Sequence, residues 1–193
     1  IVREGDFVHG DVGIRMKGSA GSLRPLEDKP GFTLKFNQFL PGKRFHGVKK
    51  VLLNNCVQDP TYVSELIGND LFRAAGVPAQ RIGFARVDLN GRNLGLYAVA
   101  EGVTSDFLAR WFKDPTGNLY EGPGEVNADL DVDSRGGAAD GADLKALTEA
   151  ASEPDSKKRI ERLEKVLDVQ RFVSFLAVEA MTAHWDGYTT GVN

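Results

Sequence analysis

Apolar and polar residues alternate in two early stretches of the chain, which is the pattern of strands with one open face. Residues 12–17 read Val-Gly-Ile-Arg-Met-Lys, and residues 32–36 read Phe-Thr-Leu-Lys-Phe. A period of two sends successive side chains to opposite faces of a sheet. We therefore expect two half-buried strands that carry Lys17 and Lys35 on the open face.

Three further stretches have strand patterns. Residues 48–54 predict a third strand, and residues 82–89 and 92–100 flank Asn90-Gly91, whose two positions tolerate the positive φ of a tight hairpin turn. The segment 94–100 is almost continuously apolar. We expect that segment to lie inside the sheet, with both of its faces covered.

The clearest helix signal covers residues 60–75. Asp59 suits an N-cap, Pro60 suits a first turn, and Gly76-Val77-Pro78 suits a stop. Val63 and Ile67 begin its apolar stripe. Glu65 lies off that stripe, where it either faces solvent, the commoner case, or pairs with a lysine on the neighbouring sheet.

Later helices are predicted from the same spacing. A short helix, capped by Thr104 or Ser105, should contain Phe107 and Trp111, and two more should cover residues 142–151 and 155–167. Between them the segment 122–141 is rich in Gly, Asp and Ala, which predicts a long solvent-facing insertion. Its aspartates at 129, 131, 133 and 140 match a calcium loop poorly, because Ser134 replaces the turn glycine.

Composition excludes several classes of function. The 193 residues carry 24 Lys and Arg against 27 Asp and Glu, a net charge of −3, so no global basic field attracts nucleic acid. The single cysteine, Cys56, excludes an internal disulfide and a cysteine-cluster metal site. No apolar run approaches the roughly 20 residues of a membrane span. The chain begins at Ile1 without a leader, so we expect a segment of a longer protein.

The last stretch, 169–193, carries the strongest candidate for chemistry. A helix-patterned apolar run ends in His184-Trp185-Asp186-Gly187, a sequence suited to a rigid loop that holds one acid in place. Asp186 is our candidate catalytic residue. The simpler interpretation is that His184 and Asp186 cap the end of a helix.

A glycine- and serine-rich loop, 18–22, follows the first strand and could present backbone N–H groups to a phosphate. Lys35 could project over this loop from the second strand. The alternative is a surface lysine whose stem lies on the sheet.

The order of these elements matches a protein-kinase-like core of class α+β. A sheet-rich lobe with one helix (1–103, linker 101–103) precedes a partial helical lobe (104–193, loop 184–193). Phosphoryl transfer needs a lysine on the phosphates, an acid that orients the lysine, an Asp near the attacking hydroxyl, and metal ligands. Lys35, Glu65, Asp186 and Asn193 occupy suitable places. Asn193 stands seven residues after Asp186 rather than the usual five.

The chain also resembles the spore-coat CotH kinase family over nearly its whole length. The likeness rests on the joint order of several short motifs. They are GIRMKG at 13–18, FTLKFN at 32–37, LNN at 53–55 with Asp59, LFRAAGVP at 71–78, LNG at 89–91 with GLY at 95–97 and Glu101, and HWDGY at 184–188.

The resemblance implies an atypical, secreted or cell-envelope protein kinase. Such an enzyme moves the γ-phosphate of ATP to Ser or Thr side chains of a protein, with Mg or Mn. It implies Asp186 as the catalytic-loop acid, Lys35 as the phosphate-contacting lysine, and Glu65 as its helix partner. Lys17 with Gly18 and Ser19, or Lys49 or Lys50, could take the place of Lys35.

The resemblance further implies that the linker around Glu101 contacts adenine through backbone groups, and that Asn193 contributes to the metal site. The family carries its main metal-binding Asp beyond the motif of Asp186, so this segment is expected to lack part of that site. A non-catalytic coat or surface-binding protein is the alternative function. A metal hydrolase using His184 and Asp186 is disfavoured, because the other histidines are only His9 and His46.

Overall fold

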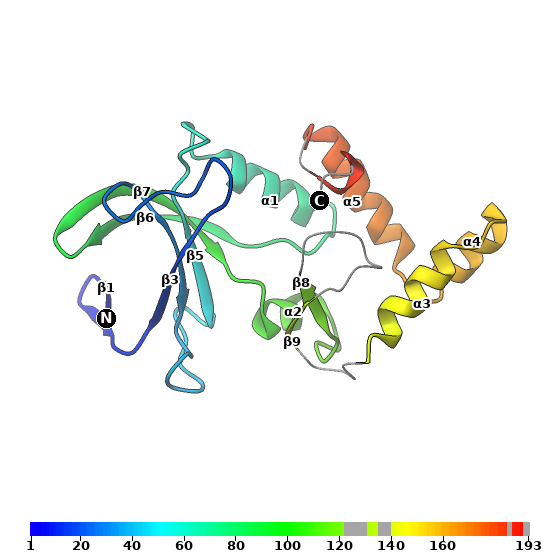
Figure 1. Ribbon diagram of the computed structural model, residues 1–193, viewed down its shortest axis with the longest axis horizontal. Coiled ribbons are helices and arrows are strands. Elements are labelled where there is room, and N and C mark those ends of the chain that lie inside the picture. The colour runs from blue at the N-terminus through cyan, green and yellow to red at the C-terminus, as the bar shows by residue number, and fades with distance from the viewer. Residues whose placement is uncertain (122–130, 135–139, 185–186, 191–193) are drawn as a thin grey trace. The chain divides into compact units, whose positions relative to one another are not determined.

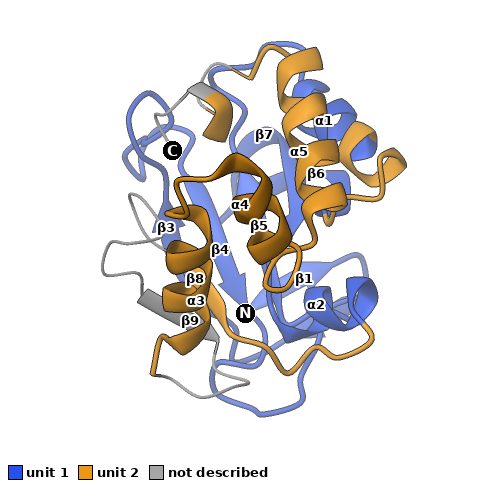
Figure 2. Cartoon of the chain, turned by 90° about the vertical axis from the view of Figure 1, so that its right-hand side faces the viewer, with its two compact units in different colours: residues 1–70, 79–112 blue, residues 71–78, 113–193 orange. Residues whose placement is uncertain are grey.

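The chain divides into two compact units, which are described separately. The computed structural model describes residues 1–121, 131–134, 140–184 and 187–190. The first unit comprises residues 1–70 with 79–112, and the second comprises residues 71–78 with 113–193 (Figure 2). The class is α+β, with a sheet-rich N-terminal region followed by several helices (Figure 1).

The first unit is built on an antiparallel five-stranded sheet (Figure 1). Its strands, in spatial order, are β3 (Gly13–Lys17), β4 (Gly31–Lys35), β5 (Lys50–Asn54), β7 (Arg92–Glu101) and β6 (Ile82–Leu89). The apolar strand β7 lies between β5 and β6, as its composition predicts.

The predicted hairpin is present between β6 and β7. Asn90 and Gly91 take φ values of 51° and 85°, the left-handed region that a tight turn of this kind requires. A second hairpin, β1 (Val2–Glu4) with β2 (Phe7–His9), was not expected from the pattern. Its strands are too short to show a period.

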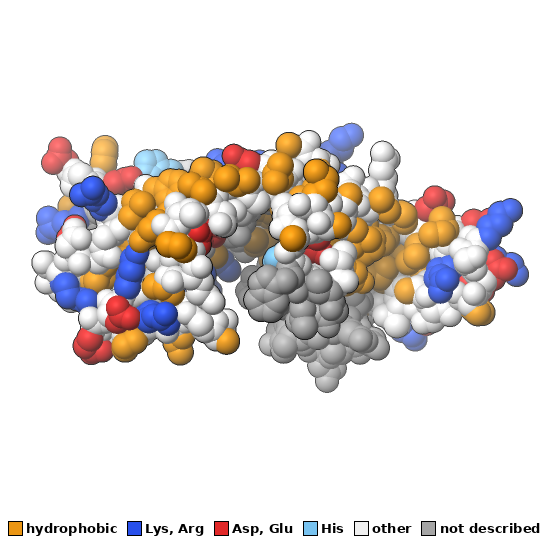
Figure 3. Space-filling view, turned by 90° about the horizontal axis from the view of Figure 1, so that it is seen from above, with side chains coloured by type: hydrophobic (Ala, Val, Ile, Leu, Met, Phe, Trp, Pro, Cys, Tyr) orange, Lys and Arg blue, Asp and Glu red, His pale blue; other side chains and the backbone are white. Residues whose placement is uncertain are grey.

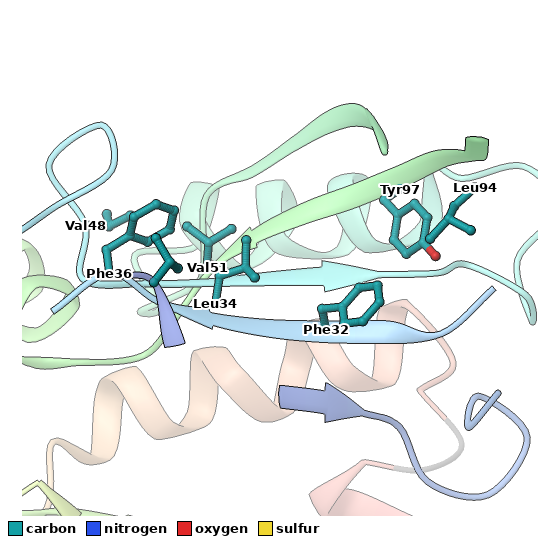
Figure 4. Close-up of a cluster of buried hydrophobic side chains, with 8 residues drawn as sticks. Phe32, Leu34, Phe36, Val48, Val51, Leu94 and Tyr97 are labelled. Atoms are coloured by element: carbon teal, nitrogen blue, oxygen red, sulfur yellow. The ribbon is translucent and has the colours of Figure 1, made fainter. Parts of the chain in front are cut away.

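One face of the sheet carries the core of the first unit. Side chains from β4, β5 and β7 lie on the same side of the strands in Figure 4. Tyr97 has no exposed surface, and its hydroxyl donates to the carbonyl oxygen of Pro30 at 2.8 Å. The buried apolar residues of this cluster are Val12, Phe32, Leu34, Phe36, Val48, Val51, Leu94 and Tyr97.

The edge strand β3 differs from the prediction. Ile14 and Met16 were expected to be buried, but they are 58% and 40% exposed, whereas Lys17 is partly buried. At the edge of a sheet the core covers only part of the last strand. Lys17 is partly buried because its side chain extends to a polar partner, Asn54. The alternation placed the strand correctly, but side chains on both of its faces are exposed, at Ile14, Arg15 and Met16.

The helix α1 (Ser64–Ala74) begins four residues later than predicted. The Asp59 carboxylate accepts hydrogen bonds from the backbone N–H groups of Thr61 and Ser64, both at 3.0 Å. Tyr62 takes a φ of 65°, which no helical turn allows. Residues 60–63 therefore form a turn around the capping carboxylate, and Pro60 precedes the helix.

The orientation of α1 reverses the expected one. Its stripe of Val63, Ile67 and Leu71 is the exposed side, with Ile67 52% exposed, and no residue of the helix is fully buried. Apolar side chains gather on the surface over α1 and the β6–β7 hairpin in Figure 3. The side of the helix with Glu65 and Asn69 bonds to the rest of the first unit, where Asn69 accepts from the backbone N–H of Gln80 at 2.9 Å. Specific polar partners, rather than the apolar stripe, orient this helix.

The short helix α2 (Ser105–Trp111) packs with the first unit, although the sequence placed it in the second domain. Among its described residues, the second unit holds a hairpin and three complete α-helices. They are β8 (Leu119–Glu121), β9 (Asp131–Ser134), α3 (Ala142–Ala151), α4 (Ser156–Leu163) and α5 (Val169–Met181), followed by the short η1 (Tyr188–Thr190).

Residues 131–134 of the calcium-loop pattern form a strand. Asp129 lies outside the described residues, and Asp131 and Asp133 lie in β9, whose extended backbone pairs with β8. A calcium loop instead folds its chain around the ion so that alternate side chains converge. No group of three or more His, Cys, Asp or Glu is placed to hold a metal ion among the described residues.

Aromatic rings connect α5 to the segment 71–78 and to η1, both within the second unit. Phe175 stacks on Phe72 with ring centroids 5.6 Å apart, and Phe172 meets Tyr188 edge to face at 5.5 Å. Through the stretches that the structure describes, no helix combines the length and the apolar character needed to cross a membrane.

Candidate functional site

A polar pocket of about 280 Å³ lies within the first unit, where β3 and β5 end and α1 begins. Three of the residues that line it, Lys17, Gly18 and Glu65, were candidates on sequence grounds. The other lining residues are Ser22, Gly31, Asn54, Asn55, Cys56, Val57, Gln58, Asp59 and Ser64.

Lys17 and Glu65 are connected through the side chain of Asn54. The Lys17 ammonium donates to Asn54 Oδ1, and Asn54 Nδ2 donates to Glu65 Oε1. Glu65 stands in the first turn of α1, and Asn54 is the last residue of β5. The amide of Asn54 thus joins a lysine of the sheet, Lys17, to an acid of α1, Glu65.

The sheet register brings Lys17 to this amide. Lys17 of β3 is paired with Gly31 of β4. A Cβ atom at residue 31 would lie 3.2 Å from Lys17 Cγ and 3.1 Å from the Lys17 carbonyl oxygen. Because glycine has no side chain, the lysine stem can cross β4 and reach Asn54 on β5.

The two charged groups have shifted pKa values. Burial lowers the pKa of Lys17 below its ordinary value, and the Glu65 carboxylate offsets part of that shift. Burial also raises the pKa of Glu65, while the hydrogen bond from Asn54 and the charge of Lys17 oppose the change. Burial thus disfavours the charged form of each group, and a ligand of opposite charge would stabilise that form. For Lys17 such a ligand is an anion.

The glycine- and serine-rich loop borders the pocket but is largely bonded to itself. The Ser19 N–H donates to Ser22 Oγ at 3.1 Å, and the Leu23 N–H donates to the Ser19 carbonyl at 2.9 Å. Gly18 lines the pocket with a φ of 136°, and a Cβ there would lie 2.9 Å from the Leu23 backbone. Gly18 thus lines the pocket, whereas Ser19 forms the turn beside it.

Asn55 fixes this loop to the sheet. Its side chain is buried, and Nδ2 donates to the carbonyl oxygens of Ser22 at 2.9 Å and Lys29 at 2.8 Å. Two successive asparagines at the end of β5 therefore have separate tasks. Asn54 holds the charged pair and Asn55 holds the loop.

The other candidate lysines lie away from Glu65. Lys35 is exposed at the end of β4, where its register partners are Gly13 and Lys50, about 13 Å along the strand from Gly31. Lys49 donates to Ser105 Oγ at 2.6 Å, and the Lys50 stem lies against Gly102. Among these lysines, the structure joins only Lys17 to the helix acid.

Glu101 ends β7 as a buried acid whose side chain is 4% exposed. Its carboxylate accepts from Arg81 Nη2 at 3.1 Å and from Arg110 Nη2. Its backbone N–H donates to the Arg81 carbonyl at 3.0 Å, and its own carbonyl accepts from Gln80 Nε2. Glu101 thus joins α2 to the sheet, and its backbone groups are already engaged within the unit.

Asp186, Trp185 and Asn193 lie outside the described residues. The residues on both sides of Asp186 are bound to one acid of α5, Glu179, which is 2% exposed. Glu179 accepts from the backbone N–H groups of Tyr188 and Thr189, both at 3.0 Å, and lies 3.4 Å from His184 Nδ1.

Glu179 was missed as a functional candidate, although its signal was present as one acid on the apolar face of a predicted helix. Burial acts to raise the pKa of Glu179, but the Thr189 and Tyr188 N–H groups and the nearby His184 outweigh it and hold that pKa below its ordinary value. The carboxylate therefore stays charged, binds the backbone of Tyr188 and Thr189 to α5, and lies beside His184.

Comparison with known proteins supports one family. A family model described as CotH kinase protein matches residues 14–193. Invasin CotH2 of Rhizopus delemar is 27% identical over 159 residues, which covers 72% of this chain and 27% of that protein. Inner spore coat protein H of Bacillus subtilis is 25% identical over 194 residues, which covers 92% of this chain and 52% of that protein. The chain therefore spans about half or less of the length of these relatives.

Proposed function

Because this chain belongs to the CotH kinase protein family, we propose that it is a protein-kinase-like phosphotransferase that acts on Ser or Thr hydroxyls of proteins. The observation that carries the proposal is the Lys17, Asn54 and Glu65 arrangement on a polar pocket. It supplies the lysine and helix acid that a kinase uses to hold nucleotide phosphates.

The pocket suits the phosphate end of ATP, which is the substrate that supplies the transferred phosphoryl group. Its volume of about 280 Å³ is smaller than a whole nucleotide needs, and the partly buried Lys17, the one cation among its lining residues, matches a phosphate oxygen. Lys17 would contact the phosphates, and Gly18 would let their oxygens approach the backbone. Adenine would then lie beyond the pocket, toward the segment that follows Glu101.

The acid of the second unit completes the proposal. Asp186 would accept the proton of the attacking hydroxyl, which is the task of the catalytic-loop Asp in protein kinases. Asn193 would contribute an oxygen ligand to a bound Mg or Mn ion, the metal that neutralises phosphate charge in such sites. The relatives are named as a spore coat protein and as invasins, so we extend a coat or surface location to this chain.

Binding and transfer measurements test the proposal. ATP titrated by calorimetry with Mg²⁺ or Mn²⁺ should bind the wild-type protein, and Lys17→Met should weaken binding by about 100-fold. Lys35→Met is the matched control and should change affinity by less than about twofold. An opposite result for the two lysines would assign the phosphate contact to Lys35.

Mass spectrometry of a Ser- and Thr-rich peptide tests the transfer step. We expect a mass increase from phosphorylation that requires ATP and that Asp186→Asn abolishes. Transfer that is undiminished in Asp186→Asn would contradict the role of this acid, and a wild-type protein that binds no ATP would contradict the kinase proposal itself.

A non-catalytic surface-binding protein is the second candidate, because relatives are named invasins and because the stripe of Val63, Ile67 and Leu71 on α1 is exposed. This function predicts that a host or coat protein binds while ATP does not. Thermal shifts with ATP and with candidate proteins distinguish the two functions.

A further inference from the structure

We propose that Asn54 is a positioning residue, which holds the Lys17 ammonium at the pocket and keeps it from direct contact with the Glu65 carboxylate. In a protein kinase the corresponding lysine and glutamate form an ion pair. Here the hydrogen bonds run from Lys17 to Asn54 and from Asn54 to Glu65. Only the identity of the ligand rests on the proposed function. The role of Asn54 rests on these contacts.

The chemistry of the three groups allows one orientation of the amide. An ammonium can only donate hydrogen bonds, and an ionised carboxylate can only accept them. An asparagine offers one acceptor oxygen and one donor NH₂ group, so its oxygen must face Lys17 and its nitrogen must face Glu65. No aliphatic or charged residue of similar size could serve both neighbours at once.

A neutral amide leaves more of the lysine charge to a ligand than a carboxylate would. Direct contact with Glu65 would neutralise the ammonium and place a negative charge where phosphate oxygens must come. With Asn54 between them, Glu65 acts on Lys17 from a greater distance. The remaining N–H donors of the ammonium stay available to an anion in the pocket.

The surroundings hold Asn54 in this position. It is the last residue of β5, and the next residue, Asn55, is buried and bonded to two carbonyl oxygens. On the other side, Glu65 sits in the first turn of α1, which Asp59 caps. The amide therefore joins two fixed elements, a strand end and a helix start.

A double-mutant cycle on ATP affinity tests the coupling. Asn54→Ala, which removes the acceptor of the Lys17 ammonium, and Glu65→Gln, which removes the charge that Asn54 Nδ2 faces, should each weaken ATP binding by about tenfold. If Glu65 acts through Asn54, the double variant should also lose about tenfold. A loss of about 100-fold in the double variant, or no loss in Asn54→Ala, would overturn the proposal.

Asn93→Ala is the matched control. The Asn93 side chain also makes two hydrogen bonds, to Asp88 Oδ1 at 3.1 Å and from the Gly95 N–H at 3.0 Å, but it lies in the hairpin outside the pocket. Its replacement should change ATP affinity by less than about twofold.

A measurement without ligand separates this inference from the kinase proposal. NMR of ¹³Cε-labelled lysine follows the titration of Lys17, whose signal is identified by its loss in Lys17→Met. Asn54→Asp should raise the pKa of Lys17, because a carboxylate then replaces the amide. An unchanged titration would overturn the inference even if ATP binds. A raised pKa in a protein that binds no ATP would support Asn54 while contradicting the ligand.

Discussion

Glu65 in the first unit and Glu179 in the second are both helical glutamates withdrawn from solvent, but different groups bond to them. Glu65 accepts from a single side-chain amide and lies at a pocket. Glu179 accepts from two backbone N–H groups and is 2% exposed. Their pKa values shift in opposite directions, with that of Glu65 raised and that of Glu179 lowered.

The difference distinguishes Glu65, which is placed to interact with a ligand, from Glu179, which fixes the position of neighbouring backbone. Backbone N–H groups that already lie in place satisfy a carboxylate in full, and such an acid has little left to offer a ligand. A partly satisfied acid next to a partly buried lysine is sensitive to any charge that enters the pocket. Burial alone therefore does not identify a functional acid, whereas the kind of partner does.

The largest expected effect is the loss of the Glu179 carboxylate. Glu179→Gln should lower the free energy of unfolding by about 3 kcal/mol, because an amide NH₂ would then face a backbone N–H donor. Urea unfolding followed by circular dichroism measures this change. Glu153→Gln is the control in the same unit, since Glu153 bonds an exposed arginine, Arg162, and should cost less than about 1 kcal/mol. Equal losses would contradict the distinction.

Glu101 extends the comparison to a buried acid bonded by cations. Glu101→Gln should lower the free energy of unfolding by about 2 kcal/mol, because Arg81 and Arg110 lose a charged acceptor. ATP affinity should stay within about twofold of wild type, since the backbone at this position is unchanged. Calorimetry and urea unfolding on the same samples check both results, and a large loss of affinity would show that the side chain itself serves the nucleotide.

The two glutamates should also give stability opposite dependences on pH. The pKa of Glu65 is raised in the folded state, so its contribution is complete below pH 4.5 and is lost as pH rises through the raised pKa. The pKa of Glu179 is lowered, so its contribution is present above pH 4.5 and is lost as pH falls through the lowered pKa.

Unfolding measured from about pH 7 to about pH 3 checks these signs. As pH falls, the wild type should gain stability relative to Glu65→Gln and lose its advantage over Glu179→Gln. Parallel curves for the two variants would show that both acids meet the same environment in solution.

The smallest expected effect concerns the start of α1, which presents Glu65. Hydrogen bonds from Thr61 and Ser64 lower the pKa of the exposed Asp59 carboxylate to about 2. Asp59→Ala should increase amide hydrogen exchange at Ser64 and slightly weaken ATP binding, while Asp59→Asn, whose single side-chain oxygen can still accept from the Ser64 N–H, should change both less. The cap contributes to stability above pH 3.8 and is lost as pH falls through about 2. Unchanged exchange in Asp59→Ala would contradict the cap.

Local patterns predicted much of the architecture. The Asn90-Gly91 hairpin, the interior position of β7 and the bounds of α3 at Ala142–Ala151 follow from turn chemistry and periodicity. Glu65 was identified as a candidate that either faces solvent or pairs with a lysine on the sheet. The pattern did not reveal that the lysine is Lys17, that Asn54 stands between them, or that Glu179 binds the backbone of Tyr188 and Thr189.

The sequence by itself determined the family, the order along the chain of the strands of the five-stranded sheet and of helices α1 to α5, and the short list of charged residues, because these depend on residue type and local spacing. Only the tertiary structure decided which lysine meets the helix acid and which side of α1 is exposed. Those choices depend on the register of β3, β4 and β5, which places Lys17 across Gly31 from Asn54. Such pairing joins residues far apart in the chain, and no local period encodes it.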